Sequence, residues 1–167
     1  MLSKKMEEAL NDQINAELFA SYLYLSMSAY FDSIGLAGFA HWMRNQNKEE
    51  MMHVEKIFDY INERGGRVRL QAIAAPQIEW DSVVAAFDDT VAHEQKVTGM
   101  VNNLVDLAIE ERDHASNNFL QWFVAEQVEE EASVGAVADK LKLVKQDSNG
   151  MFALDQEMGQ RVFTPPV

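Results

Sequence analysis

The sequence predicts an all-α fold: a four-helix bundle with a long crossover between its second and third helices and a short fifth helix near the C-terminus. Two observations support this prediction. Only three prolines and eight glycines occur among 167 residues, so few breaks interrupt helices. Apolar residues recur at three- and four-residue spacing along four long stretches. We expect one domain over residues 1–167, because this length suits a single hydrophobic core.

Five helices are expected, and each begins or ends at a recognisable signal. They cover approximately residues 3–32, 36–64, 82–111, 114–145 and 148–159. Gly65-Gly66 is a typical stop for the second helix. Ser82 and Asp113 are suitable N-caps for the third and fourth, and the fifth is expected to follow Asp147-Ser148. Pro165-Pro166 lies beyond the last helix.

The segment from Gly65 to Trp80 has sixteen residues and no helical period. At about 3.3 Å per residue it can reach about 50 Å. A helix of 28 residues would be about 42 Å long. The segment can therefore run the whole length of the bundle, which makes the third helix parallel to the second. The other connections are short and predict antiparallel neighbours.

Composition excludes several classes of protein. The absence of cysteine excludes a disulfide framework, thiolate metal sites and a cysteine nucleophile. Fourteen basic residues against 27 acidic ones give a net charge of −13, which argues against nucleic acid or an anionic membrane as partner. We expect no membrane span and no signal peptide, because no apolar run is long enough. A cytoplasmic location is the default expectation.

Polar residues interrupt the predicted core stripe near the middle of all four long helices. The interruptions are Glu17, Glu50, His53, Glu94, Gln127 and Glu130. With a rise of 1.5 Å per residue and the proposed topology, they reach the same level within about one turn. The sequence therefore predicts one polar layer across the bundle.

Four carboxylates in one dry layer cannot all stay ionised without partners. Either most are protonated, with raised pKa values, or cations neutralise them. None of the stripe positions carries Lys or Arg. Oxygen ligands with one imidazole and no sulfur suit iron or manganese, with zinc as a competitor. Two divalent ions would balance the four charges. Any single Glu taken alone would more often be a misplaced edge residue than a ligand.

Several motifs resemble those of the non-haem bacterial and archaeal ferritins, in the ferritin-like di-iron family. A Glu from each of two helices together with a Glu-x-x-His motif is the metal pattern of such bundles. The similar segments cover nearly the whole chain and include residues 15–17 (NAE), 22–27 (YLYLSM), 49–53 (EEMMH), 118–123 (NFLQWF) and 126–131 (EQVEEE).

The resemblance implies a ferroxidase centre and iron storage. Glu17, Glu50 and His53 would hold one iron, and Glu50 would bridge to a second iron held by Glu94 and Glu130. The resemblance places Gln127 beside the second iron and Tyr24 close to the centre as an electron source. It also implies a third iron site at Glu49, Glu126 and Glu129 with Glu130. From spacing alone, this last group would be a solvated acidic face.

The same resemblance implies the wider setting of the reaction. Fe(II) and either O₂ or H₂O₂ would be the substrates, and ferric oxyhydroxide would be stored inside a homo-oligomeric shell of 24 subunits. Met51 follows Glu50, where the related bacterioferritins place a haem ligand. We interpret it as a packing residue and expect no haem, because Gln127-x-x-Glu130 replaces their second Glu-x-x-His motif. His41, His93 and His114 are expected to point away from the layer.

Two alternatives stay open from the sequence. One is a di-iron oxygenase or peroxidase on the same bundle, although zero cysteines exclude the peroxidases that carry an additional Cys-x-x-Cys iron domain. The other is a metal-free bundle in which buried polar groups set the register of the helices.

Overall fold

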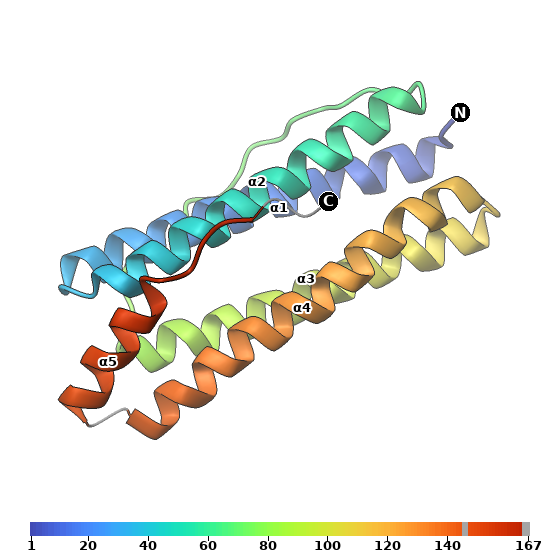
Figure 1. Ribbon diagram of the computed structural model, residues 1–167. Helices are drawn as coiled ribbons and strands as arrows, with labels where there is room; N and C mark the ends of the chain where they lie inside the picture. Colours follow the sequence, from blue (N-terminus) through green and yellow to red (C-terminus); the bar gives the residue numbers. More distant parts are fainter. Residues whose placement is uncertain (145–146, 165–167) are drawn as a thin grey trace.

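A computed structural model describes residues 1–144 and 147–164, and its five helices follow the predicted order (Figure 1). Their bounds are α1 Lys4–Ser33, α2 Ala37–Glu63, α3 Val83–Glu110, α4 His114–Val144 and α5 Ser148–Met158. These bounds lie within one residue of the predicted ones. The predicted helix end at residue 145 and the terminal Pro165, Pro166 and Val167 lie outside the described residues.

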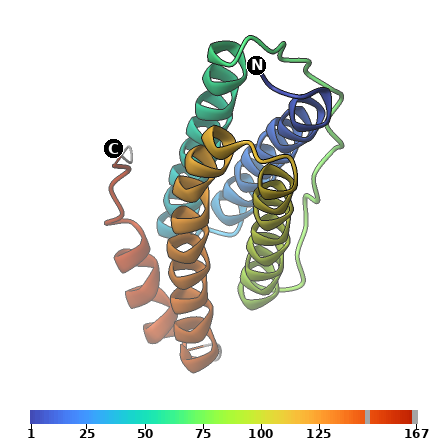
Figure 2. The same cartoon turned by 90° about the vertical axis from the view of Figure 1, so that its right-hand side faces the viewer.

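The chain forms two antiparallel helix pairs, α1 with α2 and α3 with α4 (Figure 1). The crossover runs back along the bundle without regular secondary structure, so that α3 enters parallel to α2 as predicted. Figure 2 shows the crossover and α5 on opposite sides of the four-helix bundle.

Side-chain caps hold the helix starts, and two of them, at Ser82 and Asp113, were predicted. The side chains of Ser3 and Ser82 accept hydrogen bonds from the backbone N–H three residues later, both at 3.0 Å. Asp113 accepts from the N–H of Ser116 at 3.1 Å. At the end of α2, Gly65 has a φ of 73°, a left-handed conformation that glycine adopts without steric cost.

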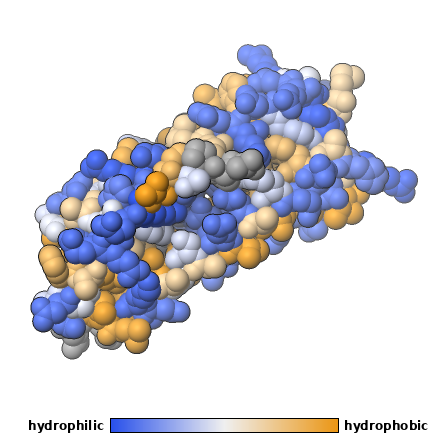
Figure 3. All heavy atoms as spheres, viewed as in Figure 1, coloured by the Kyte–Doolittle hydropathy of each residue, from blue (hydrophilic) through white to orange (hydrophobic). Residues whose placement is uncertain are grey.

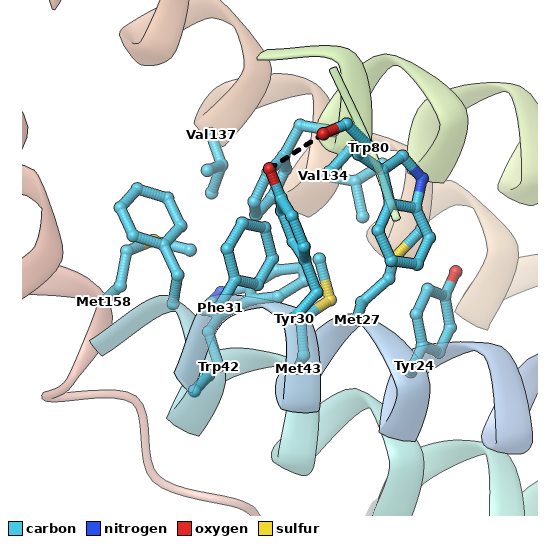
Figure 4. Packing of buried hydrophobic residues seen from close by; sticks show 14 of the residues in the cluster. Tyr24, Met27, Tyr30, Phe31, Trp42, Met43, Trp80, Val134, Val137 and Met158 are labelled. Atoms are coloured by element: carbon cyan, nitrogen blue, oxygen red, sulfur yellow. Dashed lines mark hydrogen bonds between the residues drawn. The ribbon is translucent and has the colours of Figure 1, made fainter. Parts of the chain in front are cut away.

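Both ends of the crossover are fixed to the bundle. At its start, Asn11 donates to the carbonyl of Arg67 and accepts from the N–H of Arg69. At its end, the carbonyl of Trp80 accepts from the Tyr30 hydroxyl at 3.0 Å (Figure 4). These contacts fix the height of α3 relative to α1 and α2.

The apolar core consists of two clusters, one on each side of the predicted polar layer. On α1, one cluster ends at Ile14 and the other begins at Ala20, so Glu17 lies between them. The same interval occurs on the other long helices. The cluster nearer α5 is rich in aromatic side chains, including Tyr24, Tyr30, Phe31, Trp42 and Trp80 (Figure 4).

Helix α5 packs against the start of α2. The N-cap of α2, Leu36, offers no side-chain hydrogen bond, but the carboxylate of Asp155 accepts from the N–H of Phe39 at 3.0 Å. Asp155 thus caps α2 although it lies far from that helix in the sequence. The negative charge of its carboxylate interacts favourably with the positive N-terminal end of the helix dipole. Gly38 permits the contact, because an added Cβ would lie 1.7 Å from the Asp155 carbonyl oxygen.

On the face seen in Figure 3, hydrophobic residues are interspersed with hydrophilic ones along the bundle. Among the described residues, no helix combines the length and the apolar character that crossing a bilayer requires.

The replacement Gly38→Ala should therefore displace α5. We expect a loss of about 1–3 kcal/mol, the usual cost of overpacking, and faster amide exchange in α5. Gly99→Ala is the matched control: its Cβ would meet no atom within 4 Å, and alanine favours a helix interior by up to about 1 kcal/mol. Equal thermal stability of the two variants would contradict this packing.

Candidate metal centre

Glu17, Glu50 and His53 converge between α1 and α2. Each offers a ligand atom, all within 4.8 Å of one another, and their side chains are almost fully buried. The Nδ1 atom of His53 lies 3.3 Å from Glu50 Oε2 and 3.9 Å from Glu17 Oε2. Because Glu50 and His53 are three residues apart on a helix, both side chains project from the same face.

Glu94 and Glu130 complete the layer from α3 and α4, and both are buried. The hydroxyl of Tyr24 donates a hydrogen bond to Glu94, and the amide of Gln127 donates to the same carboxylate at 3.3 Å. The amide of Gln46 donates to Glu130 Oε2 at 2.8 Å. Neutral donors therefore orient both carboxylates.

Burial and mutual repulsion disturb the proton affinities of this layer. Burial, together with the charges of Glu17 and Glu94, raises the pKa of Glu50 well above its usual range. Burial and the nearby Glu130 raise the pKa of Glu94 to about 7. Burial opposes ionisation of Glu17 and His53 too, but the attraction between these two side chains lowers the Glu17 pKa and raises that of His53. Without metal, the layer thus retains protons.

The donor set suits a hard divalent cation. Within the described ranges, no Lys or Arg forms an ion pair with any of the four buried carboxylates. Glu17 Oε2 and His53 Nε2 are buried without a hydrogen-bond partner. Carboxylate oxygens with one imidazole nitrogen are ligands that iron, manganese and zinc accept.

A second acidic group adjoins the layer on α2 and α4. Glu49, Glu126, Glu129 and Glu130 line a pocket of about 250 Å³. His53, Glu126 and Glu130 also offer atoms within 4.8 Å of one another, so the pocket and the buried layer are contiguous. Burial raises the pKa of Glu49 to about 7, although Arg161 opposes the rise. Burial also raises the pKa of Glu126, whereas Glu129 is exposed.

Three residues at these sites did not emerge from the sequence pattern as functional. Gln13 donates to Glu17 at 2.7 Å, and Gln46 donates to Glu130. Each lies four residues before a Glu of the layer, a helical spacing that could have revealed it. Arg161, which donates to Glu49 at 2.6 Å, follows α5, and no local pattern connects it to the site.

The remaining histidines and Met51 lie outside the polar layer. The ring of His93 contacts Tyr24 edge-on, with 5.9 Å between the centroids, and His41 and His114 are exposed. Met51 is 38% exposed on α2, so it does not lie in the core of this chain, and its interpretation as a packing residue stays a prediction. Its position next to Glu50 places it on a different face of that helix.

Comparison with known proteins agrees with this geometry. The family model described as "Ferritin-like domain" matches residues 7–144. "Bacterial non-heme ferritin" of Staphylococcus aureus is 42% identical over 163 residues, which cover 98% of each chain. The protein of the same name from Bacteroides fragilis is 44% identical over 161 residues, 96% of this chain and all of the other.

Solved structures show the same similarity. The open-pore ferritin of the archaeon Archaeoglobus fulgidus superposes with a TM-score of 0.96 at 54% identity, covering 97% of this chain and 99% of that one. A closed form of the ferritin from that organism, engineered by mutagenesis, gives a TM-score of 0.97 at 54% identity, with 98% and 100% covered. Family match, relatives and fold agree, and the chain belongs to the ferritin family, among the non-haem ferritins of bacteria and archaea.

Proposed function

We propose that this chain oxidises Fe(II) to Fe(III) and stores the product, as an iron-storage protein with ferroxidase activity. The observation that supports this most directly is the buried layer of four carboxylates and one imidazole, with which no Lys or Arg of the described residues forms an ion pair. The family and the fold of the relatives support the same function.

In the proposal, two Fe(II) ions bind as substrates in the layer. Glu17, Glu50 and His53 hold the first, and Glu94 and Glu130 hold the second. Glu50 lies between them and bridges the two ions. Gln127 and Tyr24 both donate hydrogen bonds to Glu94 and orient it, and the role of Tyr24 as an electron source stays a prediction. The convergence of ligand atoms at Glu17, Glu50 and His53 supports the first half of this assignment.

The ligands favour oxidation. Each Fe(II) gives up one electron, and dioxygen takes up two electrons and two protons to form hydrogen peroxide. Hard carboxylate oxygens bind Fe(III) more strongly than Fe(II), which drives the reaction. The buried carboxyl groups must lose their protons as the substrate binds, because a protonated carboxyl is a poor ligand.

The product then moves outward in the proposal. Glu49, Glu126 and Glu129, with Glu130, form a third iron site that leads from the centre toward a mineral-filled cavity. The cavity would be that of a homo-oligomeric shell of 24 subunits. One neighbour in fold is described as an open-pore ferritin, which supports an assembled shell. A cytoplasmic location and the absence of haem, nucleic acid and membrane from its partners stay predictions.

The buried ligands should control the initial rate of oxidation. We expect Glu50→Ala and His53→Ala each to slow aerobic Fe(II) oxidation by more than about tenfold while the protein stays helical, because each removes a ligand. The measurement is stopped-flow absorbance of Fe(III), with circular dichroism to check folding. Glu55→Ala, an exposed acidic position on the same helix, is the control and should keep the full rate. Normal rates in both ligand variants would refute the assignment.

The amount of iron that the protein keeps in solution should distinguish an iron-storage protein from a di-iron enzyme. With repeated additions of Fe(II) in air, we expect iron to stay in solution with the protein far beyond two ions per chain. Native mass spectrometry should find a 24-subunit particle that gains mass with iron. Uptake that stops at two ions per chain would instead indicate an oxidase or oxygenase.

Metal binding should release protons in a manner that depends on pH. Below pH 7, Glu94 holds a proton in the metal-free protein, and a bound cation must displace it; above pH 8 most of that proton has already gone. We therefore expect more protons released per Zn(II) at pH 6 than at pH 8, measured calorimetrically in buffers of different ionisation enthalpy. Glu94→Gln should reduce this difference, and any remainder is expected from Glu49, whose pKa is also raised to about 7. An equal difference in the variant would show that Glu94 is not the group that titrates.

A further inference from the structure

The segment after α5, residues 159–164, returns along α2 (Figure 1). It is held there at Arg161. The carbonyl of Arg161 accepts a hydrogen bond from Asn45 Nδ2 at 3.0 Å and lies 2.8 Å from His41 Nε2. The Arg161 guanidinium stacks 4.3 Å above the Trp42 ring. Backbone and side chain are thus both positioned by α2.

The guanidinium of Arg161 reaches into the acidic pocket. Its Nη2 donates to Glu49 Oε2 at 2.6 Å, and the two side chains are only 20% and 13% exposed. Its Nη1 is buried without a hydrogen-bond partner. Arg161 and Thr164 line the pocket together with Glu49, Glu126, Glu129 and Glu130. The segment therefore places a positive charge where the proposed third iron would bind.

Arg161 contacts the acidic pocket directly, whereas the two nearby lysines do not. Lys48 lies 5.9 Å from the ring centroid of Phe163, and Lys56 lies over the Trp122 ring. Neither forms an ion pair with the acidic pocket in the described part of the chain. Arg161 alone among these three cations donates directly to one of the four carboxylates.

We propose that Arg161 is a built-in counter-ion of the outer site, which the third cation must displace before Glu49 can serve as a ligand. This proposal rests on the proposed function, because that function assigns Glu49, Glu126 and Glu129 to a third iron. The same Glu49 oxygen cannot accept fully from a guanidinium and coordinate a divalent ion beside it, since the two cations repel at that distance.

The consequence is an order of filling. In the inner layer a cation displaces protons, including that of His53, which leave for the solvent, whereas the guanidinium of Arg161 keeps its charge and must itself move away from the outer site. The need to release its hydrogen bond to Glu49 should weaken cation binding at the outer site by about tenfold or more. The two inner ions should therefore bind first, and the outer site should stay free to receive product.

Zn(II) titration of the metal-free assembled protein tests this directly. We expect two tight sites in the unchanged protein and a weaker third one. Arg161→Gln should tighten the third site about tenfold or more and leave the two tight sites unchanged. Adding Glu49→Gln to that variant should weaken the third site again. Gln160→Ala, an exposed neighbour in the same segment, is the matched control and should bind as the unchanged protein does.

Amide hydrogen exchange of the unchanged protein supplies a second measurement that needs no substitution. Exchange in residues 159–164 should rise only when the third Zn(II) binds, as Arg161 is released. Unchanged third-site affinity in Arg161→Gln, with both tight sites intact, would overturn this inference alone. Absence of the two tight sites in the unchanged protein would overturn the proposed function and this inference with it.

Discussion

Like charge in a dry layer is the constraint on which the rest of this bundle depends. Four carboxylates lie between two apolar clusters, where each ionised group would lose several kcal/mol of hydration without a partner. The fold tolerates them because apolar packing on both sides supplies stability, and because the crossover is fixed at both ends. Protons on Glu50, Glu94 and His53 relieve the repulsion until cations replace them.

Apart from His53, the side chains that donate hydrogen bonds to the carboxylates of the layer are neutral, and their neutrality has a chemical consequence. Gln13, Gln46 and Gln127 donate amide protons to carboxylates, and Tyr24 donates its hydroxyl. A lysine or arginine in these places would orient the carboxylates equally well, but it would also cancel the charge that attracts a metal. Amides and a phenol fix the geometry and leave the negative charge available.

The sequence alone was sufficient to predict the polar layer, because helical periodicity determines which side chains face the core. All six polar interruptions of the predicted stripes are buried, and the helix bounds agree within one residue. Gln46 lies four residues before Glu50 on α2, but its role depends on Glu130 of another helix, a contact that spacing within α2 does not encode. Asp155 and Arg161 act on α2 from beyond α4, so only the tertiary arrangement of α5 reveals them.

Helix α5 and the segment after it therefore contribute both to the packing of α2 and to the acidic pocket. Asp155 caps α2 at its first turn, and Arg161, six residues later, reaches Glu49 three turns further along the same helix. Helix α2 also carries Glu50 and His53, so one element receives the cap, the inner ligands and the outer counter-ion. Helix α5 and the segment after it contact α2 at two separate heights, at Phe39 and at Glu49. The buried layer and the acidic pocket are contiguous through His53 and Glu130, yet Arg161 contacts only the pocket, which is the arrangement that the proposed order of filling requires.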